Sequence, residues 1–167
     1  VKAGSCPMYQ TLVHRPCSHQ PPQYCQKILQ SLYSTRKRKF HDVTIRCGSK
    51  DIAANQCILS ASPVFKTMFQ TGMVEMATRI ICIDDFEPDI VEHFVELLYT
   101  GEVQGTTQWD QLICMVDKYQ TLDLIPYCAD QIVSHLVLDA ENIVPVVRAL
   151  KRTEHHGPCK EAYDLVP

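Results

Sequence analysis

The chain has 167 residues, of which 46% are hydrophobic and 21% are charged, and its formal net charge is -3. This length excludes most large enzyme scaffolds, and it allows a hydrophobic core to stabilise one domain without disulfides or metal ions. The nearly balanced charge gives no reason to expect binding to nucleic acid or to an anionic membrane. We therefore expect one globular domain, with or without appendages.

Charged residues and cysteines are unevenly placed along the chain. Residues 1–50 carry nine basic side chains and one acidic one, whereas the remaining residues carry seven basic and 18 acidic ones, a division compatible with self-association. The number of cysteines, nine, is odd, so we expect free thiols in a reducing compartment, the cytoplasm or the nucleus. Those in apolar segments are expected to be buried: Cys47, Cys57, Cys82, Cys114 and Cys128.

The first 23 residues contain four prolines and no repeating apolar face, which predicts a linker or arm. Because the chain starts with Val1, we expect a fragment of a longer protein. No apolar run reaches the roughly 18 residues of a membrane span.

Residues 24–39 predict an amphipathic helix with an apolar stripe. The basic residues 36–39 suit the C-terminal end of this helix, and we expect them to be solvated. The stripe consists of Ile28, Leu29, Leu32 and Tyr33.

A small sheet and two short helices are predicted next. Alternating apolar and polar residues predict a strand over residues 43–47, and residues 51–54 can pair with it as a hairpin. A helix over residues 55–61 precedes a second helix, which Ser62 is placed to cap. Residues 79–83 are mostly β-branched and predict a short buried strand.

The remainder of the chain predicts helices. The clearest one begins at Pro88 and ends at Gly101. Its acidic residues are expected on the exposed side: Glu87, Asp89, Glu92 and Glu96. Further helices are predicted over residues 109–119, 124–137, 139–150 and 158–165. A small early sheet followed by helices indicates an α+β fold.

Several spaced motifs resemble one known family. They are His41-Asp42-Val43-Thr44-Ile45, the string ILSASPVFKTMF from Ile58 to Phe69, Leu98-Tyr99-Thr100-Gly101, and Asp117-Lys118-Tyr119. Their order resembles a BTB (POZ) domain and is most similar to the speckle-type, MATH-associated adaptors of cullin-3 ubiquitin ligases. The likeness covers roughly residues 24–138. Residues 139–167 are similar to the short helical extension that follows this domain, a partial 3-box or BACK-like segment.

The resemblance implies the BTB/POZ fold, in which a helical bundle covers a small sheet, and a protein-interaction adaptor with neither catalytic residues nor cofactors. It also implies homodimerisation, largely through the first helix, whose apolar stripe supplies the surface. The alternative is that the four residues of the stripe cover the chain's own core.

The resemblance further implies a surface for cullin-3. In cullin-binding members, a hydrophobic residue, any residue and a glutamate follow the helix that contains Phe69 here, and this chain has Met73, Val74 and Glu75 in that place. The resemblance thus implies that Phe69, Met73, Val74 and Glu75 bind the cullin. A thioether can fill a shallow apolar groove, and a carboxylate can pair with a cation at its rim. The alternative is a solvated glutamate beside a locally packed methionine. Substrate proteins would bind through a module outside this chain.

The chain departs from the family pattern just before the Ile58-Leu59 pair. Family members usually have Ala-His-Lys or Ala-His-Arg where this chain has Ala54-Asn55-Gln56, so Asp42 loses the basic partner found in co-repressor-binding BTB domains. This difference favours a ubiquitin-ligase adaptor over the alternative function, a BTB oligomerisation domain of a transcriptional regulator.

The sequence carries no recognised signature of an enzyme or of a zinc site. The chain has no Gly-x-Ser-x-Gly nucleophile motif and no phosphate-binding loop with its lysine, so we expect no enzyme activity. No two cysteines are separated by two residues. Two clusters of thiols and imidazoles were weighed as zinc ligands and discounted for their spacing: Cys6, Cys17, His19 and Cys25, and His155, His156 and Cys159.

Overall fold

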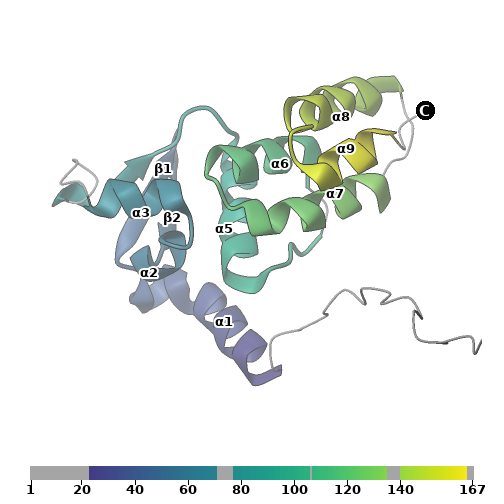
Figure 1. Ribbon diagram of the computed structural model, residues 1–167. Helices are drawn as coiled ribbons and strands as arrows, with labels where there is room; N and C mark the ends of the chain where they lie inside the picture. The colour runs from purple at the N-terminus through teal and green to yellow at the C-terminus, as the bar shows by residue number, and fades with distance from the viewer. Residues whose placement is uncertain (1–22, 71–76, 106, 135–139, 165–167) are drawn as a thin grey trace, which may run out of the picture.

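The computed structural model describes residues 23–70, 77–105, 107–134 and 140–164. Along the chain these residues form α1 (Gln23–Thr35), η1 (Arg36–Phe40), β1 (Val43–Cys47), β2 (Lys50–Ala54), α2 (Gln56–Leu59), α3 (Pro63–Gln70), β3 (Ile80–Cys82), α5 (Pro88–Thr100), α6 (Trp109–Lys118), η2 (Leu122–Leu124), α7 (Ile125–Ser134), α8 (Ala140–Arg152) and α9 (Gly157–Asp164). Figure 1 shows α5 between the sheet on one side and α6 to α9 on the other. The predicted α+β fold is confirmed.

The sheet has the order β2-β1-β3. Strands β1 and β2 are antiparallel and joined by a tight turn, in which Gly48 adopts the left-handed φ of 55°. Strand β3 lies parallel to β1, with Ile45 opposite Ile81. Both of these isoleucines are buried, which confirms the predicted strands and their inward faces.

The cysteines are only partly where the apolar pattern placed them. Cys47 and Cys128 are buried, and burial raises the pKa of Cys128 to about 12. The prediction is wrong for Cys57 and Cys82, which are exposed. Cys82 is the last residue of β3, an edge strand of the described sheet, and its side chain points away from that of the buried Ile81 before it. Cys114 is half-buried.

Helix α3 begins at Pro63, directly after Ser62, as the sequence predicted. The Ser62 hydroxyl oxygen accepts a hydrogen bond of 3.2 Å from the Phe65 backbone N–H, which is the predicted cap. The same hydroxyl donates to the Tyr119 carbonyl at 2.6 Å. The rings of Phe65 and Tyr119 stack with centroids 4.5 Å apart. Ser62 therefore joins α3 to the end of α6 within the core.

Helix α5 has the predicted ends, with Pro88 in its first turn and Gly101 at a left-handed φ of 76° after it. Two of its acidic residues are not exposed as predicted. Glu96 is buried, and its carboxylate accepts a hydrogen bond of 3.3 Å from the Gln104 backbone N–H. Glu92 is half-buried beneath the end of α1. Helix α1 and the loop after α5 therefore cover part of the side of α5 that its acidic residues had predicted to be exposed.

The C-terminal helices pack against α6 and α7 (Figure 1). They bury residues in the same hydrophobic core as the rest of the domain, namely Ala149, Leu150, Cys159 and Ala162. Helix α9 confirms the short helix predicted near residues 158–165. Among the described residues, no helix has the length and apolar character needed to cross a membrane.

Replacing Ser62 with alanine is expected to destabilise the protein by about 1 to 3 kcal/mol, because it removes the cap of α3 and leaves the buried Tyr119 carbonyl without this donor. Urea denaturation measures the loss. The control is Ser34→Ala, because the Ser34 hydroxyl is exposed and donates to the Gln30 carbonyl within its own helix. Equal effects of the two substitutions would contradict the role given to Ser62.

Candidate protein-interaction surface

The end of helix α1 packs on the domain, whereas its first turns are open to solvent. Leu32 and Tyr33 pack against the hydrophobic core, and the Tyr33 ring lies 5.7 Å from that of Tyr99 in α5. Ile28 is 47% exposed, and Tyr24, one turn before it, is also exposed. Two of the four residues predicted at the dimer interface thus contribute to the chain's own core. Ile28 remains accessible to a partner, and the fourth residue, Leu29, is half-buried.

Arg36, directly after α1, is buried with only 2% exposed, so the expectation that it is solvated is wrong. Its guanidinium donates from Nε to the Ala53 carbonyl at 2.9 Å, from Nη1 to the Tyr33 carbonyl at 2.6 Å, and from Nη2 to the Glu92 carboxylate. A planar guanidinium can reach several acceptors at once, which makes its burial tolerable. Arg36 therefore links α1, β2 and α5.

Glu92 is the acidic member of this contact. The Tyr33 hydroxyl donates to its carboxylate at 3.4 Å, and the Lys37 amine lies 3.0 Å from the same oxygen. Burial alone would raise the pKa of Glu92, but the Lys37 hydrogen bond and the Arg36 charge hold that pKa below its usual value. Burial raises the pKa of Tyr33 to about 12. Glu92 is thus kept ionised, and Tyr33 protonated, at neutral pH.

The predicted cullin contacts lie at the end of α3 and directly after it. Phe69, in its last turn, is 5% exposed and belongs to the hydrophobic core. Met73, Val74 and Glu75 lie outside the described residues. Phe69 therefore anchors the end of α3 in the hydrophobic core. Met73, Val74 and Glu75 follow it in the sequence.

Asp42 has a structural partner in this chain. Its Oδ1 accepts a hydrogen bond of 2.6 Å from the backbone N–H of Gln56, the first residue of α2. The side chain of Asn55 does not cap this helix, because its Oδ1 accepts a hydrogen bond of 2.8 Å from the Tyr99 hydroxyl and its amide donates to the Phe40 carbonyl. Asp42 thus supplies the side-chain acceptor that the start of a helix needs.

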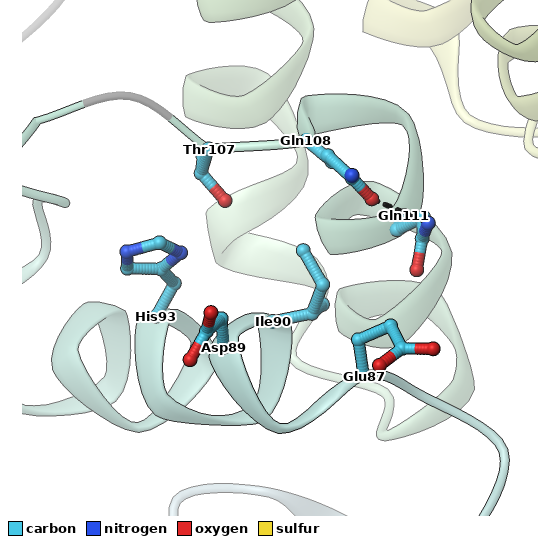
Figure 2. A pocket seen from close by; sticks show the side chains of 7 residues that line it. All are labelled: Glu87, Asp89, Ile90, His93, Thr107, Gln108 and Gln111. Carbon is cyan, nitrogen blue, oxygen red and sulfur yellow. Dashed lines mark hydrogen bonds between the residues drawn. The ribbon is translucent and has the colours of Figure 1, made fainter.

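A polar pocket of about 760 Å³ lies between α5 and the start of α6, as Figure 2 shows. Its lining residues are Glu87, Asp89, Ile90, His93, Thr107, Gln108 and Gln111. Within the described part of the chain, His93 Nδ1 and Thr107 Oγ1 are buried without a hydrogen-bond partner. No sequence motif marked this pocket, because its residues come from two segments with no distinctive spacing.

The fold and this partly open first helix define a protein-interaction module. The chain belongs to the BTB/POZ domain family, whose sequence model matches residues 29–136, more than half of the chain. This confirms the family predicted from the spaced motifs. The BTB/POZ domain is a protein-interaction fold.

Curated relatives include proteins that combine this domain with others. The chain is 41% identical over 96 residues to BTB and MATH domain-containing protein 42 of Caenorhabditis elegans, covering 53% of this chain and 23% of that protein. It is 29% identical over 120 residues to TD and POZ domain-containing protein 4 of Mus musculus, covering 70% and 32%. A BTB/POZ domain-containing protein of Arabidopsis thaliana is 36% identical over 113 residues, covering 64% and 46%. The chain therefore spans less than half of the length of each relative.

Solved structures support the fold. The BTB domain of zebrafish PATZ1 superposes with a TM-score of 0.55 at 20% identity, covering 69% of this chain and 96% of that domain. The BTB domain of human gigaxonin gives the same TM-score and identity, with coverage of 66% and 92%. At this identity the likeness concerns the fold alone.

Replacing Arg36 with methionine is expected to cost about 3 to 5 kcal/mol of stability, because Glu92 then stays partly buried without its guanidinium partner. The matched control is Lys37→Met, which removes a 61% exposed cation from the same carboxylate and is expected to cost less than about 1 kcal/mol. Chemical denaturation of both variants measures the difference. Similar losses would show that Arg36 does not hold α1 in the way described.

Proposed function

We propose that this chain is a homodimerising adaptor that binds a cullin-3 scaffold and brings substrates to a ubiquitin ligase. One observation carries the proposal: the 41% identity to a relative whose name pairs BTB with a MATH domain, which agrees with the resemblance to MATH-associated cullin adaptors. Substrates would be held by a module outside this chain. The adaptor makes no bond itself and acts by raising the effective concentration of one bound partner near another.

The cullin surface of this proposal follows α3. Burial of Phe69 gives the following segment a rigid starting point. Met73 would enter an apolar groove of the scaffold with its flexible thioether, and Glu75 would pair with a cation at the rim. Val74 lies between them in the sequence. The buried anchor supports the proposal because it fixes the end of α3, after which the proposed cullin-binding residues follow in the sequence.

The dimer surface of this proposal consists of the exposed first turns of α1 and the end of η1. Five large hydrophobic residues are exposed in the described part of the chain, and three of them lie here: Tyr24, Ile28 and Phe40. Exposed apolar side chains gathered in one segment favour contact with another protein. Because Leu32 and Tyr33 are engaged in the core, the partner would meet chiefly Ile28 and its neighbours.

The contact made by Asp42 favours the adaptor over a transcriptional regulator. Its carboxylate accepts a hydrogen bond from the start of α2, and the position that is basic in many relatives is occupied by Gln56. A charged co-repressor pocket would need both carboxylate and cation. The regulator remains the alternative outcome of the cullin experiment below.

Replacing Ile28 with glutamate is expected to convert the dimer to a monomer, because a charge would enter an apolar interface. Ile28 suits this test better than Leu32, which packs on the chain's own core. The control, Gln30→Glu, adds the same charge at an exposed position on the other side of α1. Light scattering measures the mass. A wild-type monomer, or an Ile28→Glu dimer, would refute the proposed interface.

The double substitution Met73→Ala and Glu75→Lys is expected to abolish binding to the N-terminal region of cullin-3, which we expect at micromolar affinity or tighter in the wild type. Titration calorimetry measures the affinity. The control is Glu102→Lys, which reverses an exposed charge in the loop after α5. Absence of binding by the wild type would favour the transcriptional regulator instead.

A further inference from the structure

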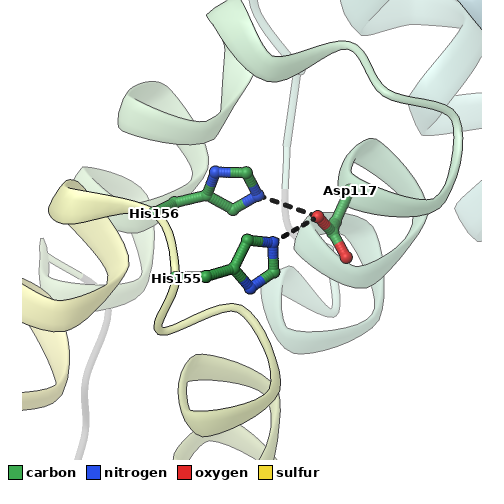
Figure 3. A group of neighbouring side chains, drawn as sticks. All are labelled: Asp117, His155 and His156. Atoms are coloured by element: carbon green, nitrogen blue, oxygen red, sulfur yellow. Dashed lines mark hydrogen bonds and ion pairs between the residues drawn. The ribbon is translucent and has the colours of Figure 1, made fainter.

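The turn between α8 and α9 brings two imidazoles to one carboxylate (Figure 3). His156 Nε2 lies 2.8 Å from Asp117 Oδ1, and His155 Nε2 lies 3.3 Å from the same oxygen. The centres of the two rings are 4.0 Å apart. The three donor atoms all lie within 4.8 Å of one another. Asp117 belongs to the last turn of α6, so the cluster connects the C-terminal helices to the rest of the domain.

An ion pair alone accounts poorly for this arrangement. One imidazole is enough to pair with a carboxylate oxygen, and two protonated rings at this separation would repel each other. A divalent cation uses all three donors at once, through the lone pairs of neutral imidazoles and the negative carboxylate. Imidazole and carboxylate donors are both common ligands of zinc.

The two distances from the Asp117 oxygen suit such an ion. Bonds of about 2.0 to 2.1 Å in a tetrahedral zinc site place neighbouring donor atoms about 3.3 Å apart. The oxygen of Asp117 already has this distance to His155. It is roughly half an ångström closer to His156, a difference that a small side-chain rotation corrects.

We propose that Asp117, His155 and His156 form a binding site for Zn²⁺ or a related first-row divalent ion, with water completing the coordination. The ion would tie the α8–α9 pair to α6. This site is independent of the adaptor function proposed above.

The turn that carries the two histidines is ordered by its own contacts. Thr153 is fully buried, and its hydroxyl donates to the Ala149 carbonyl at 3.0 Å. The His156 backbone N–H donates to the Thr153 carbonyl at 3.0 Å, and the Cys159 N–H donates to the His156 carbonyl at 3.1 Å. Because these bonds hold the turn in place, ion binding costs little ordering.

The third ligand differs from the one weighed on the sequence alone. Cys159 follows the two histidines, but it is fully buried in the core and is absent from the group of converging donors. Burial raises the pKa of its thiol, which disfavours the thiolate that binds metal. The third donor is instead the carboxylate of Asp117 in α6. Lys118, the residue after Asp117, does not compete, because its amine pairs with Asp85 at 2.5 Å.

Titration of the whole chain with Zn²⁺ and with Co²⁺ tests the site. His155→Gln is expected to weaken binding at this site at least tenfold and to remove the rise in melting temperature that Zn²⁺ gives the wild type. This variant should fold, because the His155 side chain is 59% exposed. Asp117→Asn is expected to weaken binding similarly. The control is Glu154→Gln, which alters an exposed carboxylate of the same turn and should leave binding unchanged.

The cobalt spectrum separates this site from the cysteines of the chain. Nitrogen and oxygen ligands give the d–d bands of Co²⁺ without the charge-transfer absorption of a thiolate, and these bands should disappear in His155→Gln. Three results would each overturn the proposal: no ion binding tighter than about 1 mM, binding unchanged in His155→Gln, or a cobalt spectrum due to thiolates alone. Should Asp117→Asn fail to fold, the His155 variant decides the question.

Discussion

The position of the first helix depends on one buried charge contact, that between Arg36 and Glu92. The guanidinium has acceptors on three elements, and a buried cation that lost them would be costly. Helix α1, strand β2 and helix α5 therefore adopt their relative positions together. This contact also holds the end of α1, with Leu32 and Tyr33, against the core, while the first turns of the helix, with Ile28, remain open to solvent.

Elements defined by local chemistry were predictable from the sequence. Strand β1 follows from strict alternation over residues 43–47, and the start of α3 follows from Ser62, whose hydroxyl makes the expected cap. The ends of α5 follow from Pro88 and Gly101, which are suited to the first turn and to the left-handed residue after a helix. In each case the residues that indicate the feature lie within a few residues of the feature itself.

Features that depend on distant partners were not predictable in this way. Four consecutive basic residues indicate a solvated cluster, yet Arg36 finds its acceptors 17 and 56 residues further along the chain. The same holds for Asp117, which no local spacing connects with His155. Of the candidate interaction site, the sequence indicated the helix that exposes Ile28, but only tertiary packing shows that its neighbours Leu32 and Tyr33 face inward.

The ionic character of the Arg36 contact gives the first helix a particular response to heat. Withdrawing ions from water costs less free energy as the temperature rises, whereas the stabilisation from apolar burial levels off. A helix attached by aliphatic side chains alone lacks this compensation. Warming therefore weakens the attachment of α1 less than its few apolar contacts would suggest.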